Sequence, residues 1–282
     1  MPAIAFSGEM LSYALDEPLE AAENRNEAAQ KLCCSEWRQI AMERVLDPRP
    51  RKRYPQGYGR VYPVADYEPW RVDEAFAAIY RRIAGHTKVD IYRCYELWGL
   101  AGQAAKLPGD ILEVGVWRGG TGALLAARAA ARADSYNGNG FGSKRVFLAD
   151  TFNGVVKAGE RDPYYRGGEH ADTSREAVTE LLAELDLTNV ELLPGVFPED
   201  TAERIAHRRF SLVHVDVDVY QSARDTVEWA WPRLTLGGVV VFDDYGFYGC
   251  EGVTALVDEV YERPDRLVMH NLNGQAVVTK LR

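Results

Sequence analysis

The chain has 282 residues, 46% of them hydrophobic, enough for one large domain with an appendage. Its formal net charge of −9 argues against a general affinity for nucleic acid or for anionic membranes. No apolar run approaches the roughly 20 residues that span a bilayer, and the N-terminus lacks the features of a signal peptide. The four cysteines lack zinc-site spacing, and the adjacent Cys33 and Cys34 suit a reduced helix better than a disulfide framework. We therefore expect a soluble cytoplasmic protein.

Residues 1–105 predict a helical N-terminal extension. The first 50 or so residues are acidic and helix-prone, and residues 47–70 form a linker or surface loop, because their prolines exclude a helix or central strand. Residues 70–85 and 89–107 place apolar side chains at helical spacing. Such helices are marginal in isolation and need a partner surface. We expect the extension to pack on the following domain as an acceptor-side wall, a lid or a dimer contact, in a homodimer or higher homo-oligomer.

Residues 106–282 predict a second domain in which strands alternate with helices. The strands are expected at residues 110–116, 145–150, 190–195, 210–217 and 237–245. The helices are expected at residues 120–132, 173–185, 199–207, 222–234 and 251–263. A capping box from Thr173 to Glu176 opens the second helix, and Asn273-Gly274 predicts a terminal hairpin. This order predicts an α/β fold with a parallel sheet, helices on both faces and an antiparallel strand near one edge.

The first of these strands leads into a glycine-rich turn, with glycines at positions 115, 119, 120 and 122. Such a turn lets the backbone approach a ligand at the start of a helix, although the spacing matches neither a dinucleotide fingerprint nor a phosphate-binding loop. Glu113 precedes the turn, and Asp150 ends the second strand, where an acid can accept hydrogen bonds from ribose hydroxyls. Acids beside the turn favour a positively charged ligand such as S-adenosylmethionine over a pyrophosphate-bearing nicotinamide cofactor.

Five blocks of the sequence resemble the macrocin O-methyltransferase (TylF-type) family, which methylates sugar hydroxyls of natural-product glycosides. They are GDILEVGVWRGGTGALL, ADTFNG, PGVFPEDT, HVDVDVYQSARDTVEWAWPRLTLGGVVVFDDYG and GVTALVDEV, between about residues 109 and 278. The resemblance implies a Rossmann-like class I methyltransferase fold with a mostly parallel seven-stranded sheet, S-adenosylmethionine as cofactor, and dependence on a divalent metal, usually Mg²⁺. Its cofactor-contacting segments match Glu113, Gly115, Val116, Trp117, Arg118, Gly119, Thr121, Asp150, Thr151, Phe152 and Asp200. Phe247 stands where family members often have His.

Asp216 and Asp218 interrupt an otherwise apolar strand, FSLVHVDVDVYQS, at residues 210–222. A buried carboxylate is costly unless a cation or a hydrogen-bond donor meets it. In the fold that the resemblance implies, the strands ending at Asp216 and Asp243 are neighbours, about 4.8 Å apart. We therefore expect Asp216, Asp243 and Asp244 to bind a divalent cation. The alternative is that the Asp243-Asp244 pair merely caps the following loop.

Asp218 points to the same side as Asp216 if the chain stays extended, and the family match offers it as the general base. The alternative is a hydrogen bond that ties the strand end to the next turn, with His86 or His170 as rival bases. In the expected reaction, a metal-bound sugar hydroxyl loses its proton to the base and attacks the methyl group. The loop at residues 158–174 is expected to act as a lid, with Tyr164, Tyr165 and Arg166 over the acceptor.

Three other functions are compatible with the same residues. The first is a metal-dependent hydrolase or lyase that uses the aspartate cluster without a methyl donor. The second is a binding or regulatory module that retains a cofactor fold. The third is a catechol-type methyltransferase, because adjacent phenolic hydroxyls also chelate Mg²⁺.

Overall fold

The computed structural model describes residues 54, 56–59, 61, 65–135 and 144–282. The helices expected in the first 50 or so residues lie outside this part. The chain divides into two compact units, Met1–Asp66 and Tyr67–Arg282, and all the helices and strands given below belong to the second. Within the described residues, no helix combines the length and the apolar character that a membrane span requires.

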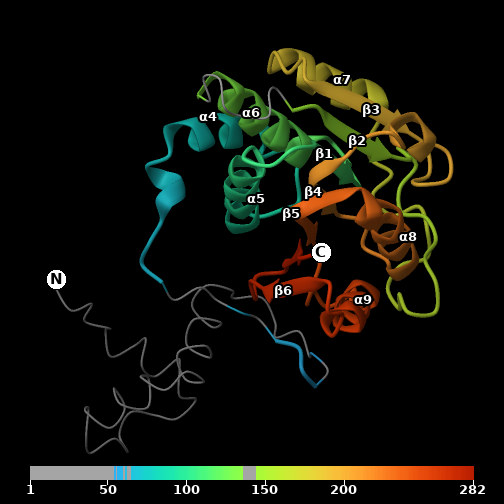
Figure 1. The fold of residues 1–282 in the computed structure, drawn as a ribbon. Helices are drawn as coiled ribbons and strands as arrows, with labels where there is room; N and C mark the ends of the chain where they lie inside the picture. Colours follow the sequence, from blue (N-terminus) through green and yellow to red (C-terminus); the bar gives the residue numbers. More distant parts are fainter. Residues whose placement is uncertain (1–53, 55, 60, 62–64, 136–143) are drawn as a thin grey trace, which may run out of the picture. The chain divides into compact units, whose positions relative to one another are not determined.

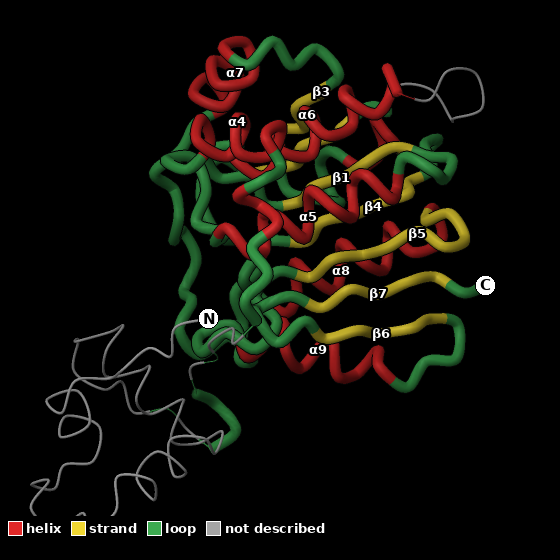
Figure 2. Tube along the Cα trace, turned by 90° about the vertical axis from the view of Figure 1, so that its left-hand side faces the viewer, coloured by secondary structure: helices red, strands yellow, loops and turns green. Residues whose placement is uncertain are grey.

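The second unit is built on a seven-stranded sheet (Figures 1 and 2). In chain order the strands are β1 Asp110–Val114, β2 Val146–Asp150, β3 Val190–Pro194, β4 Phe210–Val215, β5 Leu234–Phe242, β6 Arg266–His270 and β7 Ala276–Lys280. Their spatial order is β3-β2-β1-β4-β5-β7-β6. The first five strands are parallel, and β7 runs antiparallel to both β5 and β6. The predicted fold, including the C-terminal antiparallel hairpin, is confirmed.

Helices cover both faces of the sheet. They are α4 Glu74–Ile83, α5 Ile91–Ala104, α6 Gly120–Ser135, α7 Arg175–Glu184, α8 Tyr220–Ala230 and α9 Glu251–Tyr261, with short 3-10 turns η2 Pro69–Arg71, η3 Ala202–Ile205 and η4 Trp231–Arg233. Strand β4 shows why two layers form, because its side chains alternate between the faces. Leu212 joins the core that contains residues of α4 to α7, whereas Val213 and Val215 join the core that contains residues of α8 and α9.

Helices α4 and α5 belong to the same unit as the sheet, so the structural division at Asp66 differs from the predicted boundary at residue 105. Asp73 caps α4 by accepting from Phe76 N at 2.9 Å, and its second oxygen accepts from Trp98 Nε1 of α5 at 3.0 Å. Fully buried side chains of both helices, Phe76 and Leu97 among them, share a core with α6. Residues 67–105 thus complete the α/β unit, and their expected part in acceptor binding or dimerisation stays a prediction.

The parallel topology brings the carboxyl ends of β1, β2, β4 and β5 to one edge of the sheet. The order in which strands are added to the sheet reverses between β1 and β4, and open α/β sheets bind their ligands at such a point. The loops that follow these strands, together with residues 84–90 ahead of α5, surround the cavity described next.

Candidate active site

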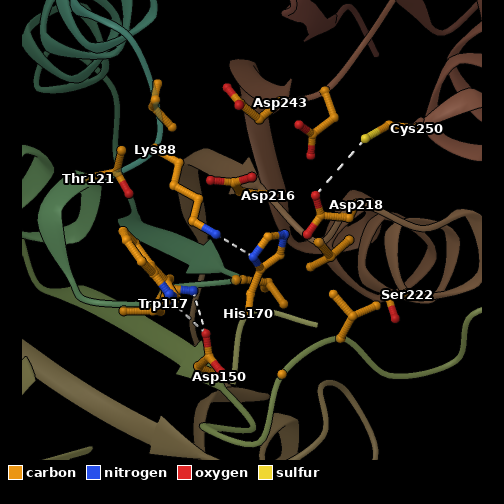
Figure 3. Close-up of a pocket in the computed structure, with 18 of the residues that line it drawn as sticks. Lys88, Trp117, Thr121, Asp150, His170, Asp216, Asp218, Ser222, Asp243 and Cys250 are labelled. Carbon is orange, nitrogen blue, oxygen red and sulfur yellow. Dashed lines mark hydrogen bonds between the residues drawn. The ribbon is translucent and has the colours of Figure 1, made fainter. Parts of the chain in front are cut away.

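A cavity of about 480 Å³ opens at this edge of the sheet (Figure 3). Its lining includes, from the strand ends, Gly115, Val116, Trp117, Thr121, Asp150, Thr151, Asp216, Asp218, Asp243 and Asp244. Helix α5 adds Arg93, and the surrounding loops add His86, Lys88, Tyr164, Tyr165, His170, Phe247, Tyr248 and Cys250. One cavity therefore gathers the predicted metal ligands, the predicted base and much of the predicted cofactor site.

Asp150 organises the glycine turn between β1 and α6. Its Oδ2 accepts hydrogen bonds from the backbone N–H groups of Val116 at 2.6 Å and Trp117 at 2.9 Å, and Oδ1 accepts from Phe152 N at 2.7 Å. Gly115 has φ +89°, and a Cβ there would lie 1.6 Å from the backbone oxygen of Asp216. Only glycine therefore lets the β1 turn approach the end of β4 this closely.

Several predicted cofactor residues do not line the cavity: Glu113, Arg118, Gly119, Phe152 and Asp200. Arg118 pairs with Asp172 at 2.7 Å and stacks on the Trp117 ring from outside. Asp200 accepts from Val196 N at 2.9 Å and so closes its own turn. Arg118 and Asp200 thus make their contacts within the protein, outside the cavity lining.

Glu113 belongs to a fully buried charge network beneath the cavity. Its Oε1 lies 2.8 Å from His214 Nδ1, and His214 Nε2 lies 3.6 Å from Asp243 Oδ1, an ion-pair distance. Burial alone would lower the pKa of His214, but its contacts with the carboxylates of Asp243 and Glu113 outweigh burial and raise the pKa to about 10. His214 thus lies in the interior between two carboxylates, a position that favours its protonated form.

The predicted metal ligands come together. One carboxylate oxygen from each of Asp216, Asp243 and Asp244 lies within 4.8 Å of the others. Burial, and then the neighbouring carboxylates, raise the pKa of both Asp216 and Asp244 well above the usual range. Burial would raise the pKa of Asp243 too, but His214 and Arg93 outweigh this and lower it.

The donor set fits a hard divalent cation. All three candidate ligands offer oxygen, the preference of Mg²⁺, and Asp244 Oδ2 is buried with no hydrogen-bond partner in the described part of the chain. Asp243 is already partnered by Gln275 Nε2 at 2.6 Å and by Arg93 Nη1. The guanidinium of Arg93 donates its hydrogen bonds to Asp90 and Asp243. Asp216 and Asp244 therefore lack this basic partner, and a bound cation would stabilise their charged forms most.

Asp218 faces the same cavity from the loop after β4. Tyr165 donates its hydroxyl hydrogen to Asp218 Oδ1 at 2.6 Å, and Cys250 Sγ lies 4.0 Å from the same oxygen. Burial raises the pKa of Asp218, although the hydrogen bond from Tyr165 opposes the shift. A carboxylate with a raised pKa is suited to take a proton from a hydroxyl. The rival bases His86 and His170 line the cavity as well.

Strained backbone is concentrated around the cavity. Among the described non-glycine residues with positive φ, four line it, namely Trp117, His170, Asp218 and Asp244. Such conformations cost about 1–3 kcal/mol each and persist where the surroundings enforce them, often at functional sites. Two of the four are the candidate base and a candidate metal ligand.

The expected lid contributes aromatic side chains to one end of the cavity. Tyr164 and Tyr165 line it, whereas Arg166 does not. The Tyr164 ring meets the Tyr248 ring edge to face, with centroids 4.9 Å apart. The ring of Phe247 lies under the Arg93 guanidinium, with the guanidinium carbon 4.6 Å from the ring centroid. These aromatic residues and Arg93 were not predicted as site residues, apart from the two lid tyrosines.

A sequence model of the macrocin O-methyltransferase (TylF) family matches residues 85–268. The chain belongs to this family. The match contains β1, the glycine turn, all five aspartates that line the cavity and the loop that carries Tyr165. The predicted family is thereby confirmed, and with it an S-adenosylmethionine-dependent class of O-methyltransferases.

Two individual relatives and one solved structure are also O-methyltransferases. The chain is 32% identical over 153 residues to the 8-demethyl-8-(2,3-dimethoxy-alpha-L-rhamnosyl)-tetracenomycin-C 4'-O-methyltransferase of Streptomyces olivaceus, covering 51% of this chain but only 56% of that protein. It is 29% identical over 205 residues to the mycinamicin III 3''-O-methyltransferase of Micromonospora griseorubida, covering 68% and 74%. The O-methyltransferase NovP superposes with a TM-score of 0.59 at 27% identity, covering 70% of this chain and 83% of that structure.

The placement of Asp150 makes a testable prediction about cofactor binding. Replacing Asp150 with Ala removes the acceptor that holds the glycine turn and that family resemblance assigns to the cofactor site. Titration with S-adenosylhomocysteine should show binding about 10- to 100-fold weaker, as expected for lost hydrogen bonds to a charged group. Glu180→Ala, which removes an exposed carboxylate on α7, is the matched control. Equal affinity in the two variants would remove Asp150 from the cofactor site.

Proposed function

We propose that this protein transfers the methyl group of S-adenosylmethionine to a sugar hydroxyl of a natural-product glycoside, with the help of a divalent cation. The observation that carries the proposal is that Asp216, Asp218, Asp243 and Asp244 line the same cavity as the glycine turn, in a chain of the TylF family. Asp216, Asp243 and Asp244 would hold the cation, and Asp218 would serve as general base.

The chain's own residues supply orientation and proton transfer. Asp218 takes the proton of the attacking hydroxyl, and Tyr165 fixes the orientation of its carboxylate through the 2.6 Å hydrogen bond. Asp150 and the backbone of Val116 and Trp117 shape the cofactor side. Bound S-adenosylmethionine would supply an electrophilic methyl group. A divalent cation would lower the energy of the developing oxyanion.

The relatives support a glycoside acceptor. One acts on a rhamnosyl tetracenomycin and another on mycinamicin III, as their names state. Both names describe methylation of a hydroxyl at a primed ring position. A sugar hydroxyl in a secondary metabolite is therefore the acceptor we propose for this chain.

The aromatic residues around the acceptor end favour one alternative acceptor, a catechol-type phenol. Tyr164, Tyr165, Phe247 and Tyr248 would accommodate a planar ring as well as the apolar face of a sugar. The hydrolase alternative has no comparable support, because the family performs methyl transfer.

A comparison of acceptors distinguishes a glycoside from a catechol-type phenol as the substrate. The protein is incubated with isotopically labelled S-adenosylmethionine, Mg²⁺ and matched sets of rhamnosyl glycosides and catechols, and labelled products are identified by mass spectrometry. We expect label in the sugar of at least one glycoside. Label confined to the catechols would replace the proposed acceptor class with the phenolic one.

A further inference from the structure

Lys88 places a cation in the cavity, and the reaction proposed above assigns it no role. It lies in the loop between α4 and α5, and Figure 3 shows its side chain reaching across the cavity to His170, between Trp117 and Asp216. Its Nζ contacts His170 Nδ1 and lies 4.7 Å from the centroid of the Trp117 ring. An ammonium group has only hydrogens to donate, so the Nδ1 atom of His170 is the acceptor in this contact.

Lys88 lacks a carboxylate partner of its own. Among the residues that the structure describes, none places a carboxylate oxygen within 4.0 Å of Lys88 Nζ. The charge of Lys88 acts on the carboxyl groups of Asp172 and Asp218 only at longer range, where it favours their charged forms. The other strongly basic side chain in the lining, Arg93, is engaged by Asp90 and Asp243. The cavity thus holds one lysine cation that is free to receive an anion from a ligand.

The loop that carries His170 is fixed in place, so the Lys88–His170 contact is a built feature of the cavity. Val155 and the residues before His170 exchange two backbone hydrogen bonds, Val155 N to Glu169 O at 2.8 Å and Gly168 N to Val155 O at 2.9 Å. The Glu169 carboxylate accepts from the N–H groups of Arg166 and Gly167 at 2.7 and 2.9 Å. These bonds hold His170 at φ +64°, with its ring toward Lys88.

Charge determines which part of a ligand Lys88 can receive. The cofactor of the proposed reaction has a single anionic group, the carboxylate of its methionyl part. The carboxyl groups of Asp216, Asp218, Asp243 and Asp244 offer that group no positive charge, and Arg93 already pairs with Asp90 and Asp243. Lys88 instead lies over Trp117, whose backbone N–H is bonded to Asp150, so this cation borders the cofactor turn. We propose that Lys88, oriented by His170, binds the carboxylate of the methionyl part of the cofactor. This inference rests on the proposed function.

Two nucleosides isolate this interaction. S-adenosylhomocysteine contains the carboxylate, and 5'-methylthioadenosine contains the adenosine and sulfur but no amino acid part. Each is titrated calorimetrically into the wild-type protein, Lys88→Met, Lys88→Arg and the control Lys106→Met, which replaces an exposed lysine that bonds to Gln103 and lies outside the cavity lining. Lys88→Met should weaken S-adenosylhomocysteine binding about 10- to 100-fold, the range for one hydrogen bond between charged groups. Its affinity for 5'-methylthioadenosine should stay within about twofold of wild type, as for a surface substitution.

The remaining variants sharpen the test. Lys88→Arg should recover part of the lost affinity because it restores the charge, and Lys106→Met should match wild type for both nucleosides. An unchanged affinity of Lys88→Met for S-adenosylhomocysteine would overturn the inference, and a raised KM for an acidic acceptor would then reassign Lys88 to acceptor binding. An equal loss for both nucleosides would also overturn it. Wild-type protein that binds neither nucleoside would overturn the proposed function itself.

Discussion

Replacing His214 with Leu should lower the free energy of unfolding by about 3–5 kcal/mol, the cost of leaving a buried charge without its partner. The imidazole lies between the carboxylates of Glu113 and Asp243, and all three side chains are buried. Without His214, Glu113 retains no other hydrogen-bond partner among the described residues. Urea unfolding followed by circular dichroism measures the loss.

Two further variants identify the charge network as the cause. Glu113→Leu/His214→Leu removes both charges of the closest pair, so it should be less destabilised than the sum of the two single variants, with a coupling of about 0.5–3 kcal/mol. His207→Leu removes an exposed histidine and should change stability by no more than about 0.5 kcal/mol. Additive single effects would show that Glu113 and His214 do not stabilise each other.

The second large effect distinguishes a base from a metal ligand. Asp218→Asn keeps the shape of the side chain but removes its ability to take a proton, so methyl transfer should slow by roughly 10²–10⁴-fold. Binding of S-adenosylhomocysteine and of the metal should stay near wild type. Asp243→Asn should instead weaken metal binding, and excess Mg²⁺ should recover part of its rate. Single-turnover kinetics at several Mg²⁺ concentrations measures both variants.

Asp258→Asn is the matched control, because this exposed carboxylate on α9 lies outside the cavity lining. It should keep the wild-type rate. If added Mg²⁺ rescues Asp218→Asn as it does Asp243→Asn, then Asp218 is a metal ligand. The base would then be sought at His170 or His86, which line the same cavity.

The sequence was sufficient to predict features that depend on strand order and chain direction. The family resemblance implied that the strands before Asp216 and Asp243 are neighbours, and parallel neighbours in register must bring their carboxyl ends together. The hairpin at Asn273-Gly274 follows from local turn chemistry, and Gly274 has φ +89°.

Other features depend on which partner a side chain finds, and a pattern does not specify this. Glu113 was expected to contact the cofactor, but its register partner across β1 and β4 is His214, and the two pair in the interior. The sequence can also leave the capping residue of a helix uncertain by one position. The expected cap Thr173 donates its hydroxyl to Trp117 O, and Ser174 caps α7 by accepting from Ala177 N at 3.1 Å.

Lys88 and Arg93 show a third limit, because they lie in the helical region whose docking brings them to the cavity. Nothing in residues 84–93 indicates that a lysine there will meet His170, or that an arginine will meet Asp243, 150 residues further along the chain. Such contacts arise from the packing of α5 against α6 and the sheet, which is a tertiary property.

Methyl transfer by protein from which divalent metal has been removed tests the proposed reaction most directly. The wild-type protein is treated with EDTA, freed of chelator, and given labelled S-adenosylmethionine and a rhamnosyl glycoside while Mg²⁺ is titrated back. If Asp216, Asp243 and Asp244 hold an essential cation, no label should reach the sugar at zero Mg²⁺, and transfer should rise to saturation as the metal is restored. Transfer at full rate in the metal-free protein would contradict the metal site.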